Sequence, residues 1–280
     1  MPMLPAMANE GSTSLSRALA ILNVLGTVGA DGEGLGVMQI ARLVGREKSQ
    51  VSRTLKALQE AGFVTRDPDT LCYRLGWRIF TLAVNAADQR LREQAPHVLR
   101  HLVARVREAA HLSVLEGGGV LTLMSEHPAW VIQAAPWVGR LAPLYCTSAG
   151  RALLFDHTDA EVRALLRDTP FTAKGPNAPR DIEEVLVRLH EARRRGFVVV
   201  EEEFEPGHVA VAAPVRDFRG RVIAALNISA PKFRLGRSLV AAGREVKAAA
   251  DHLSHALVTA REAEPPVSAT RTVPYARRAS

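Results

Sequence analysis

Basic side chains crowd one short stretch of an otherwise balanced sequence. The chain has 36 Lys and Arg against 29 Asp and Glu, yet residues 46–56 hold four bases and a single acid, Glu47. On an exposed helix, Arg and Gln hydrogen-bond base edges in the major groove, while Lys and Ser mostly contact phosphates. The pattern therefore predicts that this stretch reads duplex DNA. The candidate contacts are Lys48, Ser49, Gln50, Ser52, Arg53 and Lys56.

Two short helices joined by a glycine turn are expected to present these side chains. Apolar periodicity predicts one helix over 38–44 and another over 49–61. Ala41 is small enough for the helices to cross closely, Gly45 accepts the positive φ of a tight turn, and Val51 fills the space between them. With the helix that precedes them, they predict a helix-turn-helix unit.

Two-residue periodicity replaces the helical period after the third helix. Segments 63–66 and 71–75 flank the turn-forming stretch Asp67–Thr70, which predicts a β-hairpin. This hairpin would be a wing whose Arg66 and Arg74 contact the DNA backbone or the minor groove. Because one such unit buries only about 600–1,000 Å² on DNA, we expect a dimer on two half-sites of double-stranded operator DNA.

The remainder of the chain alternates strands with helices and indicates an α+β fold. A helix is expected over Trp77–Arg92 and a second one from about Ala95, because Pro96 interrupts the periodicity. Strands are expected over 111–115, 120–125, 130–133, 197–203, 209–215 and 221–229, and helices over 148–155, 160–167, 182–195 and 239–260. The resulting parts are a flexible tail over 1–13, a winged helix over 14–76 with Ser14 as its first N-cap, a linker helix over 77–95, a second domain over 96–260, and a flexible tail over 261–280.

Composition limits the classes of protein that fit. Of the 280 residues, 47% are apolar, which suffices for two folded cores and argues against a mainly disordered chain. No apolar stretch approaches the roughly 18 residues of a membrane helix, and no secretory signal is recognisable at the N-terminus. Two cysteines cannot build a disulfide framework, so a cytoplasmic protein without a membrane partner is expected.

Several separated segments together match one known family. They are 48–58, 60–70, 73–76, 143–152, 195–197, 201–207, 212–215, 220–222 and 228–231. In these segments the chain resembles IclR-type transcriptional regulators, from about Ser14 to Ala260. The resemblance implies a winged helix followed by a GAF-like α/β domain, which binds a small organic effector and thereby changes operator affinity. We expect a repressor.

The resemblance also implies an effector pocket between the loop 143–150 and the later strands. Leu144 and Gly150 match family pocket positions, and Gly150 at a helix start would offer space and N–H groups to a carboxylate. Asn227 and Ser229 lie two residues apart on an expected strand. They share one face of it, so both can hydrogen-bond the ligand.

Two positions depart from relatives that sense small keto acids. Val200 stands where those relatives tend to carry an acidic residue, and Ala210 where they carry a cysteine. Both changes predict a roomier and drier pocket, which favours an aromatic or similarly sized effector over a two- or three-carbon acid. Trp130, Trp137 and Tyr145 would wall it, although packing in the core or at a dimer interface is an equally open interpretation for each.

Other groupings suggest different chemistry and are weighed against simpler explanations. Glu201, Glu202, Glu203 and Glu205 could act in acid–base catalysis or bind a metal with a nearby histidine, but charges that fix a turn are the better interpretation. Glu201 also adjoins the predicted pocket. Two histidine pairs have spacings that metal ligands use, namely His97 with His101 and His252 with His255, but solvated or interface histidines are the better interpretation.

Cys146 could serve as a nucleophile beside His111 or His208, but a lone cysteine is more often a small buried apolar residue. We therefore expect no catalytic residue, no metal and no cofactor. Two alternatives stay open: an enzyme that carries an accessory DNA-binding domain, and an architectural DNA-binding protein without a ligand pocket.

Assembly is expected through the winged helix and the linker. Leu22, Leu25, Ile79 and Leu82 are more apolar positions than one small domain can bury. The family resemblance adds a dimer of dimers. Because an effector changes DNA affinity only by preferring one conformer, the linker helix is expected to transmit the change.

Overall fold

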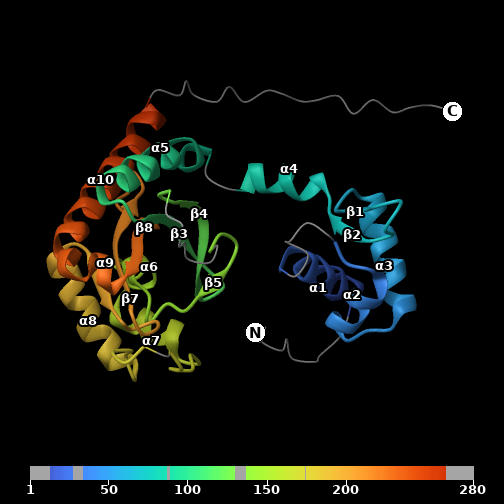
Figure 1. The fold of residues 1–280 in the computed structure, drawn as a ribbon, viewed down its shortest axis with the longest axis horizontal. Helices are drawn as coiled ribbons and strands as arrows, with labels where there is room; N and C mark the ends of the chain where they lie inside the picture. Colours follow the sequence, from blue (N-terminus) through green and yellow to red (C-terminus); the bar gives the residue numbers. More distant parts are fainter. Residues whose placement is uncertain (1–12, 28–33, 87–88, 130–136, 174, 263–280) are drawn as a thin grey trace. The chain divides into compact units, whose positions relative to one another are not determined.

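The chain folds as two compact units, one up to Gln89 and one from Arg90 (Figure 1). The computed structural model describes residues 13–27, 34–86, 89–129, 137–173 and 175–262. The expected tails and the expected strand over 130–133, with Trp130, lie outside these residues, except for the tail residues 13, 261 and 262. Each unit has its own buried apolar core.

Three helices form the core of the first unit: α1 (Ser14–Thr27), α2 (Val37–Val44) and α3 (Lys48–Glu60). Ile21, Ile40 and Leu55 meet in that core with no exposed surface. Helix α1 is capped by the residue before the predicted cap, since the Thr13 hydroxyl accepts a hydrogen bond from the Ser16 N–H at 3.2 Å. Thr13, not Ser14, is therefore the N-cap.

The turn between α2 and α3 has the predicted geometry. Gly45 ends α2 at φ 62° and ψ 41°, in the left-handed region. A Cβ built on Gly45 would meet nothing within 4 Å, so the backbone conformation and not lack of space requires glycine. Ala41 and Val51 are both buried where the helices cross. The helix-turn-helix prediction is confirmed.

A two-stranded hairpin, β1 (Val64–Arg66) and β2 (Tyr73–Leu75), follows α3 as predicted. The Asp67 carboxylate accepts hydrogen bonds from the N–H groups of Asp69 and Thr70, which closes the turn. The bridge between Leu35 and Tyr73 adds a third short extended segment to the hairpin. Helix α4 (Trp77–Ala86) then completes the first unit.

A six-stranded antiparallel sheet organises the second unit. Its order is β5 (Leu141–Ala142), β4 (Gly119–Glu126), β3 (Ala109–Glu116), β8 (Val222–Pro231), β7 (His208–Arg216) and β6 (Val198–Glu201). Strands β7 and β8 are the hairpin predicted around Asp217, whose Oδ1 accepts hydrogen bonds from the N–H groups of Arg219 and Arg221. The mixed α+β class is confirmed.

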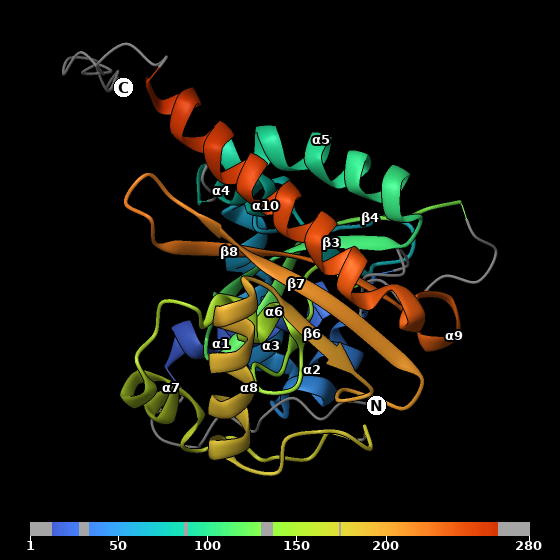
Figure 2. The same ribbon diagram turned by 90° about the vertical axis from the view of Figure 1, so that its left-hand side faces the viewer.

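Helices cover both faces of this sheet (Figure 2). Helices α5 (Gln89–Val106) and α10 (Leu239–Glu262) pack on one face, with α9 (Lys232–Leu235) and a 3₁₀ turn (Gly236–Ser238) at its end. Helices α6 (Ser148–Leu153), α7 (Asp159–Leu166) and α8 (Ile182–Arg195) pack on the other. Strand β7 is apolar over 209–215 because alternate residues enter the two cores.

The break between two helices that the sequence placed at Pro96 does not occur there. Helix α4 ends at Ala86 and α5 begins at Gln89, with Pro96 inside α5. A proline in a helix interior costs about 3 kcal/mol. That cost is exceeded here because α5 buries a long apolar face on both sides of Pro96, each large side chain contributing about 1.5–3 kcal/mol. The buried residues are Leu91, Ala95, Val98, Leu99, Leu102 and Val103.

Other differences from the predicted elements are local. The strand expected over 197–203 ends at Glu201, because Glu202 takes a left-handed backbone with φ 52°. Strand β5 and helix α9 were not predicted, since two and four residues are too short to show a period. The remaining helices and strands that lie among the described residues match their predicted ranges to within three residues at each end.

Gly243, inside α10, allows a close approach that no other residue would. A Cβ at this position would lie 2.1 Å from Cε2 of the buried Phe197. Gly243→Ala should therefore destabilise the protein by about 1–3 kcal/mol, although alanine favours helix formation. Chemical denaturation followed by circular dichroism measures the change.

Gly26→Ala in α1 is the matched control. Its Cβ would make an ordinary contact with Leu75 at 3.6 Å, so stability should rise by about 0.5–1 kcal/mol. An equally stable Gly243→Ala variant would contradict the packing described for α10.

Candidate nucleic-acid interface and effector site

Helix α3 turns one face to the core and the opposite face to solvent. Val51 and Leu55 are fully buried on the inner face. Of the side chains predicted to contact DNA on this helix, Gln50 is half-buried and the others are exposed. The Arg53 Nε donates a long 3.4 Å hydrogen bond to the Ser49 carbonyl oxygen. The outer face thus offers a row of basic and hydroxyl groups to a partner.

Both predicted wing residues are exposed on the hairpin. The Arg66 Nε donates to the Leu71 carbonyl oxygen at 3.3 Å, and its guanidinium lies 5.3 Å from the centre of the Tyr73 ring. Arg74 occupies the central position of β2, opposite Thr65. These contacts hold the side chain of Arg66 against the hairpin. Both arginines are exposed on the hairpin, which therefore presents a basic surface.

The second unit holds a small cavity on the side of the sheet that α6 covers. Its volume is about 60 Å³. The lining residues are His111, Ser113, Val120, Thr122, Trp137, Ala142, Cys146, Thr147, Ser148, Ala149, Val200, Phe204, His208, Ala210, Asn227 and Ser229. Buried polar residues are few among the described residues, and five of the eight line this cavity: His111, Ser113, Thr122, Ser148 and Asn227.

Strand register brings these polar groups together. His111 on β3 lies opposite Ser125 on β4 and opposite Asn227 on β8. The His111 Nδ1 is 2.8 Å from the Ser125 hydroxyl, and its Nε2 is 3.1 Å from the Ser229 hydroxyl. A row of hydrogen-bonding groups thus crosses three strands of an otherwise apolar face.

Two polar atoms at the cavity lack a hydrogen-bond partner among the described residues: the Asn227 Oδ1 and the His208 Nδ1. Asn227 is 8% exposed. A buried polar atom without a partner costs about 1–3 kcal/mol, so such atoms mark a place where another molecule is expected to bind. Burial, together with the charges of His127 and His208, lowers the pKa of His111 to about 4.

The structure brings five of the nine predicted effector residues to this cavity: Trp137, Val200, Ala210, Asn227 and Ser229. The indole of Trp137 meets Phe204 edge to face at 5.6 Å between ring centres. Val200 and Ala210 are paired across β6 and β7. The two departures from the family pattern therefore lie side by side in the wall of one cavity.

Three predicted residues lie behind the lining instead. Leu144 and Tyr145 are buried in the core beside α6, and the Ala173 N–H donates a hydrogen bond to the Tyr145 hydroxyl at 2.7 Å. The Gly150 N–H, predicted to face a ligand, donates to the Thr147 hydroxyl at 3.1 Å. A Cβ on Gly150 would lie 2.2 Å from the Leu144 oxygen, so this glycine provides close backbone packing rather than ligand space.

Glu201 does not line this cavity. Strand alternation sends it to the opposite side from Val200, where it pairs with Lys232 at 2.9 Å. Glu202 also pairs with Lys232 and accepts a hydrogen bond from the Gly207 N–H, as expected for charges that fix a turn. Glu203 differs from that expectation, because it is buried and binds Arg151 through both carboxylate oxygens at 2.7 and 2.8 Å.

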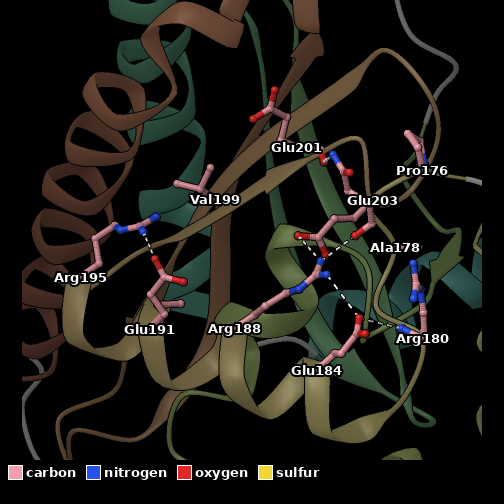
Figure 3. Close-up of a pocket in the computed structure, with 12 residues that line it drawn as sticks. Pro176, Ala178, Arg180, Glu184, Arg188, Glu191, Arg195, Val199, Glu201 and Glu203 are labelled. Carbon is pink, nitrogen blue, oxygen red and sulfur yellow. Dashed lines mark hydrogen bonds and ion pairs between the residues drawn. The ribbon is translucent and has the colours of Figure 1, made fainter.

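Glu201 lines a larger groove of about 590 Å³ between α8 and β6 (Figure 3). Its charged side chains are largely paired with one another. The Arg188 Nη1 lies 3.2 Å from the Glu203 Oε1, and the Arg195 Nη2 lies 2.5 Å from the Glu191 Oε1. Mutual neutralisation leaves this groove without a strong preference for either sign of ligand charge.

Apart from Asn227 and Ser229, sequence patterns missed the polar residues of the cavity lining. His111, Ser113 and Thr122 lie on β3 and β4, far in sequence from the predicted pocket. The available signal was a two-residue repeat of polar residues, 111 and 113, within an apolar strand. That repeat shows that one face of the strand is polar, but it does not show which other strands contribute residues to the same face of the sheet.

The structure offers little support for the alternative chemistries. Burial raises the pKa of the Cys146 thiol to about 12, whereas a nucleophilic cysteine needs a lowered pKa. Nowhere in the described part of the chain do three or more His, Cys, Asp or Glu side chains gather as metal ligands. Among the same residues, no helix combines the length and apolarity needed to cross a bilayer.

Comparison with known proteins identifies the family. Residues 14–68 match the IclR helix-turn-helix domain, and residues 84–255 match the domain described as bacterial transcriptional regulator IclR C-terminal. The chain belongs to the IclR family. It is therefore a DNA-binding transcriptional regulator with a small-molecule effector domain, as its sequence predicted.

Individual IclR-family members support this assignment. The HTH-type transcriptional regulator XynR of Escherichia coli is 30% identical over 83% of this chain and 91% of its own length. The transcriptional repressor AllR of Escherichia coli is 30% identical over 90% of this chain and 92% of its own length. A solved IclR homologue from Microbacterium hydrocarbonoxydans, complexed with 4-hydroxybenzoate, has a TM-score of 0.78 at 26% identity and covers 88% of this chain and 99% of that one.

His111 should remain uncharged at neutral pH. Because folding lowers its pKa from 6.5 to about 4, the unfolded state takes up the proton first as pH falls. The folded chain then loses roughly 3 kcal/mol between pH 6.5 and pH 4 from this group. In NMR of ¹³C-histidine-labelled protein, the resonance that disappears in His111→Gln should show no inflection above about pH 5. An inflection near 6.5 would contradict the buried placement of this ring.

Proposed function

We propose that this IclR-family protein is a dimeric repressor that reads its operator with α3 and responds to a hydroxylated aromatic acid. The observation that carries the DNA half is the division of α3 into a fully buried apolar face and an exposed basic face behind a glycine turn. Because a bacterial operator lies in the cytoplasm, we place the protein there as well.

The residues of α3 divide by the contacts they support. Arg53 is exposed in the middle of the helix, where a guanidinium can bind a guanine through two hydrogen bonds. Lys48 is the first residue of α3, where an ammonium can bind a phosphate without reading sequence. Arg66 and Arg74 extend the basic surface along the wing.

Arg53→Ala should weaken operator binding by about 1–3 kcal/mol and relax sequence preference. Lys48→Ala should weaken binding to all sequences alike and reduce the slope of log K against log salt by about one. Fluorescence anisotropy with operator and scrambled duplexes, at several salt concentrations, separates these effects. Arg167→Ala, an exposed base on the second unit, is the matched control. Operator binding that both α3 variants retain unchanged would exclude α3 as the reading helix.

The cavity of the second unit supports the ligand class. Its polar row continues on the same sheet face into Ala210 and Val200, because Ser229 is paired with Ala210 and Ala210 with Val200. The rings of Trp137 and Phe204 also line the cavity, so the lining offers both hydrogen-bonding groups and apolar surface for a flat ring. The Asn227 Oδ1 is an acceptor that finds no donor within the described part of the chain, and a ligand hydroxyl would supply one. The solved homologue bound to 4-hydroxybenzoate makes such a compound the natural probe.

The size of the cavity supplies a basis for regulation. A cavity that accepts benzene has a volume of about 150 Å³, whereas this one has about 60 Å³. An aromatic effector therefore binds only after the walls separate. Preference for an enlarged conformer is the differential affinity that effector control of DNA binding requires.

Exposed apolar side chains on the first unit support a dimer. Trp77 is 81% exposed and Phe80 is 61% exposed on α4, and their rings meet edge to face. Leu15 and Leu19 are similarly exposed on α1. Leu25, which the sequence assigned to this surface, is instead buried in the core, while Leu22 and Ile79 are half-buried and Leu82 is exposed. A partner chain that covers such a surface gains the free energy of apolar burial.

Replacing Trp77 and Phe80 together by serine should weaken self-association and, with it, binding to a two-half-site operator. Sedimentation equilibrium measures the association, which should shift toward smaller species in the variant. Leu43→Ser, on the exposed side of α2, is the control for loss of an apolar side chain in the same unit. A double variant that associates like the wild type would place the dimer contact elsewhere. Assembly of two dimers into a tetramer is part of the proposal and is visible in the same experiment.

A further inference from the structure

Among the described residues, the wall of the effector cavity carries no permanent charge. None of its lining residues is Asp, Glu, Lys or Arg, and its titratable side chains are His111, Cys146 and His208. A carboxylate that enters such a cavity gives up hydration, which is costly unless a partner charge replaces it. His111 and His208 are therefore the lining side chains that could supply positive charge to an acid effector.

His208 is the group placed to supply that charge. It lines the cavity, and its Nδ1 has no hydrogen-bond partner among the described residues. The centre of its ring lies 6.1 Å from the centre of the Phe204 ring. His111 is less suitable, because hydroxyl groups already lie within hydrogen-bond distance of both its nitrogens.

The charged groups around His208 leave it neutral while the cavity is empty. Burial lowers its pKa, and the nearby Glu205 opposes that effect. On the same loop, Glu202 is paired with Lys232 and Glu203 with Arg151. Glu201 at the end of β6 is also paired with Lys232.

The remaining titratable neighbours carry no negative charge. His111 on β3 is neutral, Cys146 before α6 stays a thiol, and His127 after β4 lies beside His111 at 5.9 Å between ring centres. The titratable residues of β3 and of the segment before α6 that line the cavity, His111 and Cys146, therefore bring no negative charge to compete with a bound carboxylate for the imidazolium of His208.

We propose that the cavity binds a monocarboxylic acid together with one proton, which the His208 imidazole accepts, so that the loaded cavity is electrically neutral. This inference rests on the proposed acid effector. The carboxylate enters as an anion, a proton from solvent joins a ring nitrogen of His208, and an imidazolium–carboxylate pair forms without any bond breaking in the ligand. A dicarboxylate would leave one charge uncompensated and is excluded.

Isothermal titration of the full-length protein with 4-hydroxybenzoate tests the proposal. Affinity should fall by up to about tenfold for each pH unit between roughly pH 6 and pH 8, as uptake of one proton requires. Repeating the titration in buffers of different ionisation enthalpy counts the protons, and the count should approach one. The uncharged analogue 4-hydroxybenzyl alcohol should show neither the pH dependence nor the proton uptake.

His208→Gln keeps a hydrogen-bonding side chain but cannot take up the proton, so it should remove the pH dependence and weaken binding about tenfold or more at pH 6. His190→Gln is the matched control, because His190 lies on α8 and contacts Asp159 rather than the cavity. Its titration should match that of the wild type. A terephthalate titration, with its second carboxylate, should show no binding.

Each contrary result has a distinct meaning. Tight binding of 4-hydroxybenzoate without proton uptake would overturn the inference while leaving the proposed effector class intact. Proton uptake that persists in His208→Gln would overturn the assignment to this residue. If neither aromatic compound binds at any pH, the inference fails with the proposed effector class, and operator binding measured on the same preparation shows whether the DNA-reading function survives.

Discussion

Hydrogen-bonding groups at the centre of a water-excluding sheet are the constraint on which the second unit depends. Five buried polar residues line the cavity, and strand register lets several of them satisfy one another, as His111 does with Ser125 and Ser229. The groups left without partners would be a defect in a purely structural core. In an effector domain, a bound molecule that hydrogen-bonds to these groups removes the cost of leaving them unpaired.

The cavity wall is held by a second buried interaction just behind it. Arg151 on α6 and Glu203 after β6 form a bidentate ion pair with almost no exposure. Breaking such a pair strands a buried charge and costs about 3–5 kcal/mol, so helix and loop move together or not at all. Phe204, the residue next to Glu203, lines the cavity. The pair therefore connects α6 to the loop after β6, and both contribute residues to the cavity wall.

How much the sequence could predict depended on how local each signal was. Helix α8 was predicted at both ends, because the Asp181 side chain caps its start and Gly196 adopts the left-handed conformation that ends it. The glycine turn before α3 was equally local. The predicted pocket mixed residues of the cavity with Leu144, Tyr145 and Gly150 behind it, because strand pairing between distant segments decides which side chains share a cavity. Pro96 led to a wrong prediction for α5, because burial of a long apolar face outweighed the local tendency of proline to end a helix.

The two outermost strands of the large sheet have a consequence for assembly. Strand β5 spans two residues and β6 four, and β6 stops where Glu202 turns into the left-handed region. Edges this short offer few free amide and carbonyl groups to a neighbouring chain, which protects against open-ended sheet growth. If copies of this unit associate, side-chain contacts rather than strand pairing would join them, and such contacts can be made and broken without unfolding either copy.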